Sequence, residues 1–114
     1  LTKEGQAVGP FGVMGGYMQP QGHAQVVMNT VDFHLNPQAA LDAARWQWIE
    51  GKKVRVEPEF PSAIAQALVR KGHQIEVAVD GISFGRGQII WRDPESGVLF
   101  GGTEKRADGS VAAW

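Results

Sequence analysis

The pattern of apolar and polar positions predicts short strands spread along the whole chain. Val54 and Val56 alternate with Lys53 and Arg55, which is the period of a half-buried strand. A DPESG turn at residues 93–97 separates two further apolar runs and indicates a hairpin. The expected strands are residues 11–14, 45–49, 52–58, 74–80, 87–92 and 98–102.

Between these strands, a helical period begins after residue 19. Ala24, Val27, Met28 and Val31 recur at i, i+3, i+4 and i+7, so they are predicted to form the apolar face of a helix. The polar residues of this segment, Gln25 among them, fall elsewhere on the helix.

Two later helices are indicated by their end signals. Asn36 is expected to cap a helix that has Pro37 at its first position. Pro61 begins another helix, and Gly72 ends it. With no repeat or linker in view, the chain is predicted to be a single mixed domain of helices and strands over residues 1–114.

Composition narrows the classes of function. The 114 residues can bury one modest core, and the net charge of -1 without clustering gives no electrostatic case for nucleic acid or an anionic membrane surface. The chain has no cysteine, and Asp32, His34 and His73 lack the spacings of zinc ligands, so no metal or cofactor is expected. It starts without an initiator methionine, and the natural product is expected to extend upstream.

The glycine pair Gly15-Gly16, between the first strand and the first helix, is the main candidate for chemistry. Consecutive glycines there allow a tight turn, or they present bare backbone N–H groups to an anion. The spacing does not match G-x-G-x-x-G and no G-K-[ST] follows, so a phosphate site is disfavoured. The other candidate anion is the oxyanion that develops on the carbonyl oxygen during acyl transfer.

The order of motifs from residue 11 to residue 114 resembles the C-terminal part of the small subunit of the γ-glutamyltransferase family. The motifs are the glycine pair, an N-P-Q-A helix start, D-A-x-R before aromatic residues, R-V-E, a helix closed by G-H, and R-x-D-G near the end. They occur here at residues 15–16, 36–39, 42–46, 55–57, 72–73 and 106–109.

This resemblance implies an α+β fold, namely part of the four-layer αββα sandwich of the N-terminal-nucleophile hydrolases. It also implies a precursor that cleaves itself into two chains and frees an N-terminal threonine as the nucleophile. That threonine would take the γ-glutamyl group from glutathione-like amides and pass it to water or an amino acid. Gly15 and Gly16 would be the oxyanion donors, and the nucleophile itself is absent from this chain, which should be inactive alone.

Departures from the family pattern point to a particular branch. Met14 and Tyr17 flank the glycine pair where better-studied members have proline and serine, as in the γ-glutamyltransferase-like and cephalosporin acylase-like branch. Tyr17 and Gln19 are candidates to line the acyl pocket. The implied partners are the large subunit, the N-terminal part of the small subunit and a small-molecule substrate, and an uncovered sheet face would also favour a homo-oligomer.

Other conspicuous residues have structural interpretations. His23 is expected to be a solvated or hydrogen-bonded histidine, and Arg45 and Arg106 are candidates for buried ion pairs that hold the C-terminal tail. Trp114 is expected to pin that tail to the surface. The alternative to a catalytic fragment is a noncatalytic module that binds a protein or a small anion at the glycine pair.

Overall fold

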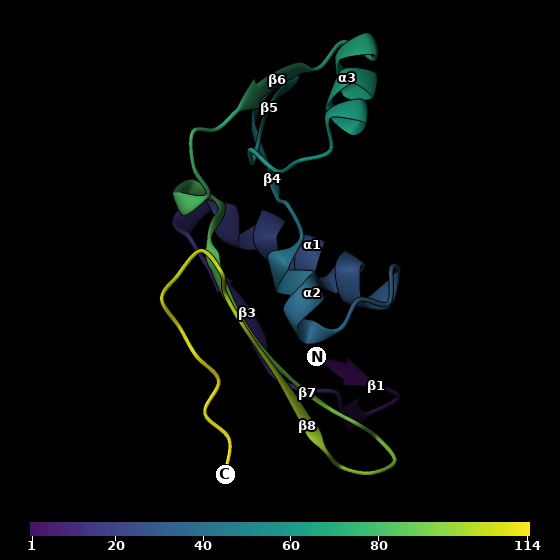
Figure 1. Cartoon of the computed structure of the whole chain (residues 1–114). Helices are drawn as coiled ribbons and strands as arrows, with labels where there is room; N and C mark the ends of the chain where they lie inside the picture. Colours follow the sequence, from purple (N-terminus) through teal and green to yellow (C-terminus); the bar gives the residue numbers. More distant parts are fainter.

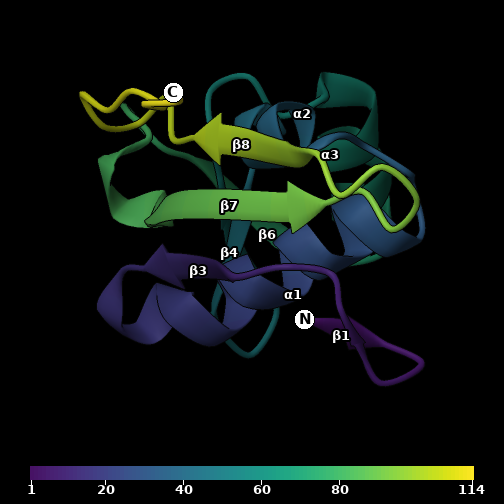
Figure 2. The ribbon, with the colours of Figure 1, turned by 90° about the horizontal axis from the view of Figure 1, so that it is seen from below.

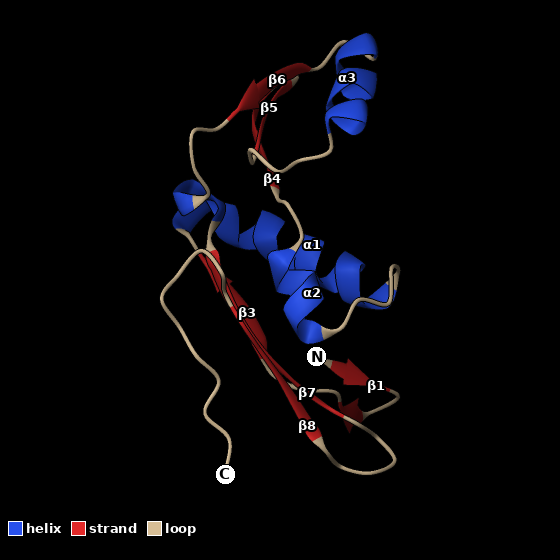
Figure 3. Cartoon of the chain, viewed as in Figure 1, coloured by secondary structure: helices blue, strands red, loops and turns tan.

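The computed structural model describes all residues from 1 to 114 as an elongated chain of helices and strands (Figures 1 and 3). The strands are β1 (Thr2–Lys3), β2 (Gln6–Ala7), β3 (Phe11–Met14), β4 (Trp46–Glu50), β5 (Lys53–Val56), β6 (Gln74–Val77), β7 (Arg86–Arg92) and β8 (Leu99–Thr103). The helices are α1 (Gln19–Val31), α2 (Pro37–Asp42) and α3 (Ser62–Arg70), with short 3-10 turns η1 (Gly16–Met18) and η2 (Ile82–Phe84). No helix has the length and apolar character that crossing a bilayer requires.

The larger sheet has the order β3-β7-β8, and all its pairs are antiparallel. β7 and β8 form the predicted hairpin, whose turn is held by the Asp93 carboxylate accepting from the N–H groups of Glu95 and Ser96. Helices α1 and α2 lie on one face of this sheet, as Figure 2 shows. Buried residues from the sheet and both helices form the core there, namely Val13, Val26, Ala40, Leu41, Ile89 and Trp91.

The smaller sheet has the order β4-β5-β6 and carries α3. β4 and β5 form a hairpin at Gly51, which has φ 47°, and α3 connects β5 to the parallel strand β6. Gly72, with φ 89°, ends α3 as its sequence predicted. The Asn36 side chain caps α2 by accepting from the Ala39 N–H at 2.9 Å, also as predicted.

Two glutamine side chains of α1 occupy the free edge of β4. The Gln25 amide accepts from the Trp46 N–H at 3.0 Å and donates to the Trp46 carbonyl at 2.8 Å. Gln21 pairs with the Trp48 backbone in the same way, at 2.7 and 3.1 Å. Because an edge strand leaves backbone groups unpaired, these amides stand in for a neighbouring strand and join the smaller sheet to α1.

The predicted apolar face of α1 is wrong. Met28 and Val31 are exposed, whereas Gly22, Gln25 and Val26 are buried. A Cβ on Gly22 would come within 2.7 Å of a Val13 methyl group, so the glycine lets the helix approach the sheet closely. Polar Gln25 can be buried because the Trp46 backbone satisfies its amide.

Of the two contacts predicted to hold the C-terminal tail, the one made by Trp114 is wrong. Trp114 is fully exposed and pins nothing. The buried side chains near this end are those of Glu104 and Arg106, and Val111 lies against Gly101 of β8. The tail is therefore held by the buried ion pairs of Glu104 and Arg106 and by the contact of Val111 with β8.

The face of the larger sheet opposite the helices is covered only by the C-terminal tail, where Val111 lies against Gly101. Figure 2 shows no helix or strand in front of it. Met14, Ile90 and Leu99 lie on exposed positions of its three strands. The outward positions of β7 also include the polar residues Arg86, Gln88 and Arg92, so this face is mixed in character. Its exposure agrees with the expectation of a sheet left half covered.

Candidate functional site

Two adjacent backbone N–H groups are free at the turn between β3 and α1. Gly15 has φ 149° and Gly16 has φ 57°, conformations that L-residues with a Cβ rarely adopt. The Met18 N–H closes the turn by donating to the Gly15 carbonyl at 3.0 Å. Neither the Gly15 N–H nor the Gly16 N–H donates a hydrogen bond within the chain, and Gly16 is exposed. This backbone can therefore donate to an acceptor from outside.

Gly85 supports the turn from the neighbouring segment. A Cβ added to Gly15 would stand 2.9 Å from the Gly85 Cα. A Cβ on Gly85, whose φ is 80°, would stand 2.6 Å from the Met14 carbonyl oxygen. The two backbones touch directly, and only glycine permits this approach on both sides.

Arg45 holds Gly85 from the interior. Its Nη1 donates to the carbonyl oxygens of Phe84 and Gly85, both at 3.0 Å. Its Nη2 donates to Glu104 Oε2 at 2.7 Å, and the same oxygen accepts from the Gly87 N–H at 2.8 Å. Arg45 is only 2% exposed, so the segment beside the glycine turn is tied to a buried charged group.

Glu57 and Arg106 extend these contacts into a buried cluster of four charges. Arg106 pairs with both carboxylate oxygens of Glu57 and donates to Glu104 Oε1 at 2.6 Å. The Arg45 N–H donates to Glu57 Oε2 at 2.6 Å. Arg106 also donates to the Leu41 and Ala43 carbonyls, at 2.8 and 3.0 Å. The cluster joins the end of α2 to both sheets.

The pKa shifts follow from this geometry. Burial by itself would raise the pKa of Glu104, but the charges of Arg45 and Arg106 outweigh burial and hold that pKa below its usual value. Burial and then the Arg106 charge lower the pKa of Arg45. Burial opposes the charge on Arg106 too, yet its hydrogen bonds to Glu57 and the charge of Glu104 raise its pKa.

The buried ion pairs predicted for Arg45 and Arg106 are confirmed. Their carboxylate partners, Glu57 and Glu104, were not predicted. Both glutamates directly follow a strand, β5 or β8, and Glu57 also ends the R-V-E motif, but neither signal identifies the arginine that each glutamate contacts.

A hollow of about 390 Å³ adjoins the glycine turn. Met14 and Gln19, which flank the turn on either side, both line it, together with Gly12, Val13, His23, Arg86 and Gln88. The hollow therefore lies against the segment that carries the free N–H groups. No carboxylate lines it.

His23 has the structural role expected of it. Its Nε2 accepts from the Val13 N–H at 3.3 Å, and its Nδ1 lies 2.6 Å from the Gln19 carbonyl oxygen. These contacts fit a ring with its proton on Nδ1. The histidine satisfies a backbone N–H at the free edge of β3 and holds the first turn of α1.

The other candidates from the sequence are dispersed. Tyr17 is 96% exposed and does not line the hollow beside the turn, whereas Gln19 does. Asp32 and His34 are exposed in the loop after α1, far along the chain from His73. The structure has no group of three or more potential ligand side chains placed to hold a metal.

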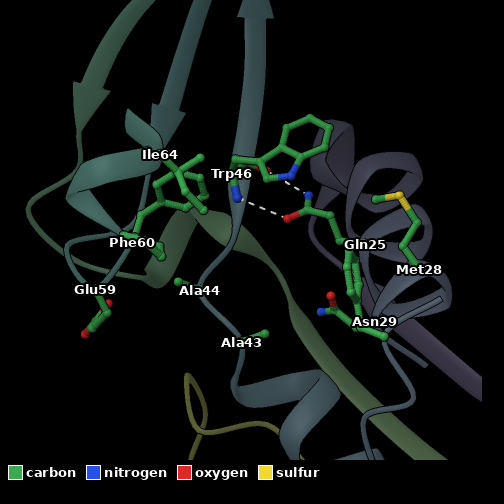
Figure 4. A pocket seen from close by; sticks show the side chains of 11 residues that line it. Gln25, Met28, Asn29, Ala43, Ala44, Trp46, Glu59, Phe60 and Ile64 are labelled. Carbon is green, nitrogen blue, oxygen red and sulfur yellow. Dashed lines mark hydrogen bonds between the residues drawn. The ribbon is translucent and has the colours of Figure 1, made fainter. Parts of the chain in front are cut away.

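A second, more apolar hollow of about 460 Å³ lies between α1 and the segment before α3 (Figure 4). Figure 4 shows Met28 on one side and Phe60 and Ile64 on the other, with the Gln25 amide hydrogen-bonded to Trp46 between them. It shares no lining residue with the hollow beside the glycine turn.

Comparison with known proteins identifies the family. The family pattern described as gamma-glutamyltranspeptidase matches residues 1–114. The chain belongs to the gamma-glutamyltranspeptidase family. A glutathione hydrolase-like proenzyme of Bacillus subtilis is 34% identical to this gamma-glutamyltranspeptidase-family chain over 107 residues, which cover 89% of the chain and 20% of the proenzyme.

Two solved structures show the same fold as this gamma-glutamyltranspeptidase-family chain. A cephalosporin acylase from Bacillus halodurans is 72% identical with a TM-score of 0.96, covering 99% of this chain and 21% of that one. A gamma-glutamyltranspeptidase from Pseudomonas nitroreducens is 22% identical with a TM-score of 0.85, covering 100% and 59%.

The predicted fold, part of an N-terminal-nucleophile hydrolase sandwich of α+β class, is confirmed. This gamma-glutamyltranspeptidase-family chain spans about a fifth of the length of the Bacillus proenzyme and of the acylase. It is thus a fragment of an enzyme of the gamma-glutamyltranspeptidase and acylase family.

Proposed function

We propose that this chain supplies the oxyanion-binding backbone of an enzyme that cleaves amides through an acyl-enzyme. The observation that carries the proposal is the pair of free N–H groups at Gly15 and Gly16, supported by Gly85. When a nucleophile adds to an amide carbonyl, the oxygen becomes an anion. One prearranged donor stabilises such an oxyanion by about 3 kcal/mol, because the donor needs no rearrangement as the charge develops.

We infer that the nucleophile is a threonine outside this chain, freed when a precursor cleaves itself. Its α-amino group takes the hydroxyl proton as the oxygen attacks. The tetrahedral intermediate then expels the amine and leaves an acyl ester on the threonine. Water or an amino acid takes the acyl group in the second step. The Bacillus relative is itself named a proenzyme, which supports a precursor here.

Two acyl donors are supported by the relatives. The Bacillus relative is named glutathione hydrolase-like, which favours a γ-glutamyl amide such as glutathione. The 72% identical structure is a cephalosporin acylase, which favours the acyl side chain of a cephalosporin. Gln19 borders the hollow beside the turn, and Tyr17 projects next to the glycine pair, so both are proposed to contact the acyl group.

The rest of the enzyme is the proposed partner. The face of the larger sheet opposite the helices carries exposed Met14, Ile90 and Leu99, and α1 exposes Met28 and Val31. Apolar surface of this kind favours burial against another layer. We infer that the large subunit and the preceding part of the small subunit cover these faces.

Replacing a single backbone amide tests the oxyanion role. In the full-length precursor, an α-hydroxy acid in place of Gly16 turns its N–H into an ester oxygen without adding a side chain. We expect kcat for γ-glutamyl p-nitroanilide to fall by about 100-fold or more with little change in KM, because the lost donor acts mainly on the transition state. The same replacement at Gly109, whose N–H also makes no hydrogen bond in the chain, is the matched control.

The result for the Gly16 ester decides whether this backbone N–H binds an oxyanion. Unchanged kcat in the Gly16 ester, with the control also active, would refute the oxyanion role. N-terminal sequencing of the cleaved wild type should find threonine. If the protein cleaves no acyl donor and no chain with an N-terminal threonine forms, the proposal of an enzyme is refuted. The noncatalytic binding module is then the remaining hypothesis.

A further inference from the structure

Gly85 contacts the peptide unit that joins β3 to the glycine turn. A Cβ on Gly85 would stand 2.6 Å from the Met14 carbonyl oxygen, closer than the Cβ atoms of real side chains come to such an atom. From the other side, a Cβ on Gly15 would stand 2.9 Å from the Gly85 Cα. The two segments therefore meet backbone to backbone, with no flexible side chain between them.

This contact falls on the peptide unit that carries one of the two proposed oxyanion donors. The Met14 carbonyl and the Gly15 N–H belong to one peptide unit, which is planar and turns as one body. A group that pushes on the Met14 carbonyl oxygen therefore also turns the Gly15 N–H. A main-chain oxygen cannot swing aside as the end of a side chain can, so a side chain at residue 85 would redirect this donor.

The segment around Gly85 is itself held by buried charged groups. Arg45 donates to the carbonyl oxygens of Phe84 and Gly85, both at 3.0 Å. The Glu104 carboxylate accepts from the Gly87 N–H at 2.8 Å. Arg45 and Glu104 are 2% and 1% exposed. Gly85 cannot move away from the turn without breaking these hydrogen bonds, and bonds to buried charged groups are costly to lose.

We propose that Gly85 is a positioning residue for the reaction, which fixes the Gly15 N–H in the direction that the developing oxyanion needs. The proposal rests on the proposed function and deepens it, because it assigns the alignment of one donor to a residue outside the glycine pair. Catalysis depends steeply on such alignment, and a misplacement of about 1 Å can cost about 100-fold in rate. A glycine needed only for the fold would affect stability and leave kcat unchanged.

The test is Gly85→Ala in the cleaved full-length protein, with γ-glutamyl p-nitroanilide as the acyl donor. We expect kcat to fall by roughly 10- to 100-fold with little change in KM, because the redirected N–H acts mainly on the transition state. Formation and breakdown of the acyl-enzyme both place negative charge on the same carbonyl oxygen. The burst of p-nitroaniline and its steady-state release should therefore slow by similar factors.

Gly87→Ala is the matched control. It adds the same methyl group two residues further along the chain, where the Cβ would come within 2.5 Å of a Leu41 methyl group. This crowding falls in the core between β7 and α2, so the variant should lower Tm and keep the kcat of the wild type. The comparison separates the redirected donor from the general effect of a crowded interior.

An ester at Gly15 identifies the donor through which Gly85 acts. An α-hydroxy acid in place of Gly15 removes its N–H and adds no side chain, so that change alone should lower kcat by about 100-fold or more. In this ester, Gly85→Ala should lower kcat by less than about 3-fold further, because two changes that act on one hydrogen bond are not additive. A purely structural effect of Gly85→Ala would multiply with that of the ester.

A second variant keeps the test decisive where Gly85→Ala does not fold. The new Cβ would also lie 2.9 Å from the Val13 Cγ1. Gly85→Ala/Val13→Ala removes that contact and leaves the one with the Met14 oxygen, and its kcat is compared with that of Val13→Ala. Failure of both Gly85 variants to fold, with Val13→Ala folded, would make Gly85 a residue for folding only and overturn the proposal.

The remaining outcomes distinguish this proposal from the proposed function. Wild-type kcat in folded Gly85→Ala, an equal loss in Gly87→Ala, or an undiminished further loss in the Gly15 ester overturns the positioning role alone. A Gly15 ester with the kcat of the wild type also overturns it, and the Gly16 ester then decides the oxyanion role. A wild type that cleaves no acyl donor refutes the proposed function, and the positioning role with it.

Discussion

Removing the guanidinium of Arg45 should destabilise the protein far more than removing a surface arginine. In Arg45→Met, Glu104 keeps Arg106 as its only cationic partner, and the carbonyls of Phe84 and Gly85 lose their side-chain donor. All of these groups lie in the interior. Water cannot replace the lost partners there without opening the fold.

The expected cost follows from burial. Removing one partner of a buried ion pair costs about 3–5 kcal/mol, because the remaining charge stays desolvated. Each carbonyl left without a donor adds about 1–3 kcal/mol at most, and these terms overlap with the first because they share one side chain. We therefore expect a loss of about 4 kcal/mol in the free energy of unfolding.

Arg55→Met is the control for the loss of an arginine ion pair. Arg55 bonds Glu76 at 2.8 Å, with the two side chains 33% and 40% exposed. An exposed pair contributes only about 0–1 kcal/mol, since water screens it. Urea unfolding of the two variants in the full-length protein, followed by tryptophan fluorescence, measures the difference. Equal unfolding midpoints would refute the reasoning, and so would an Arg45→Met/Glu104→Gln double variant less stable than the sum of the two single losses predicts.

Three further predictions concern the turn, acid and a helix cap. Gly15→Ala should lower Tm more than Gly16→Ala, because its Cβ would stand 2.9 Å from the Gly85 Cα whereas that of Gly16 meets no atom within 4 Å. The pKa of Glu104 in the folded protein lies below its usual 4.5, so its contribution to stability is complete above pH 4.5 and is lost as the pH falls through the folded pKa. Below pH 4.5, the Tm of Glu104→Gln should therefore fall less steeply with pH than the Tm of the wild type. Asn36→Ala should cost about 1 kcal/mol in urea unfolding, since the Ala39 N–H loses its acceptor, and a change below a few tenths would contradict the cap.

Local signals in the sequence predicted the ends of elements well. Asn36 caps α2, Gly72 ends α3, and Asp93 holds the hairpin turn, each through a contact within three residues or a positive φ. Such contacts depend on the chemistry of neighbouring residues, so the sequence contains all the information they need. The bare backbone of Gly15-Gly16 was predicted for the same reason.

Contacts between distant segments could not be predicted in this way. Arg106 meets Glu57 across 49 residues of chain, and Arg45 meets Glu104 across 59. Nothing local tells which carboxylate a buried arginine will find. The contact of Gly85 with the glycine turn also joins segments far apart in the sequence. It could not be predicted, because a glycine next to a strand indicates only a turn.

The wrong prediction of the apolar face of α1 has a different cause. The apolar period of Ala24, Met28 and Val31 is real, but these residues face outward here, while Gln25 faces inward and pairs with backbone. A helical period of apolar residues indicates an amphipathic helix, and it does not show against what the apolar face packs. Under the proposed function, this outward stripe is one of the faces that the rest of the enzyme would cover. The predicted apolar face is therefore wrong for this chain, because the periodicity does not show which residues a close approach to the sheet will bury.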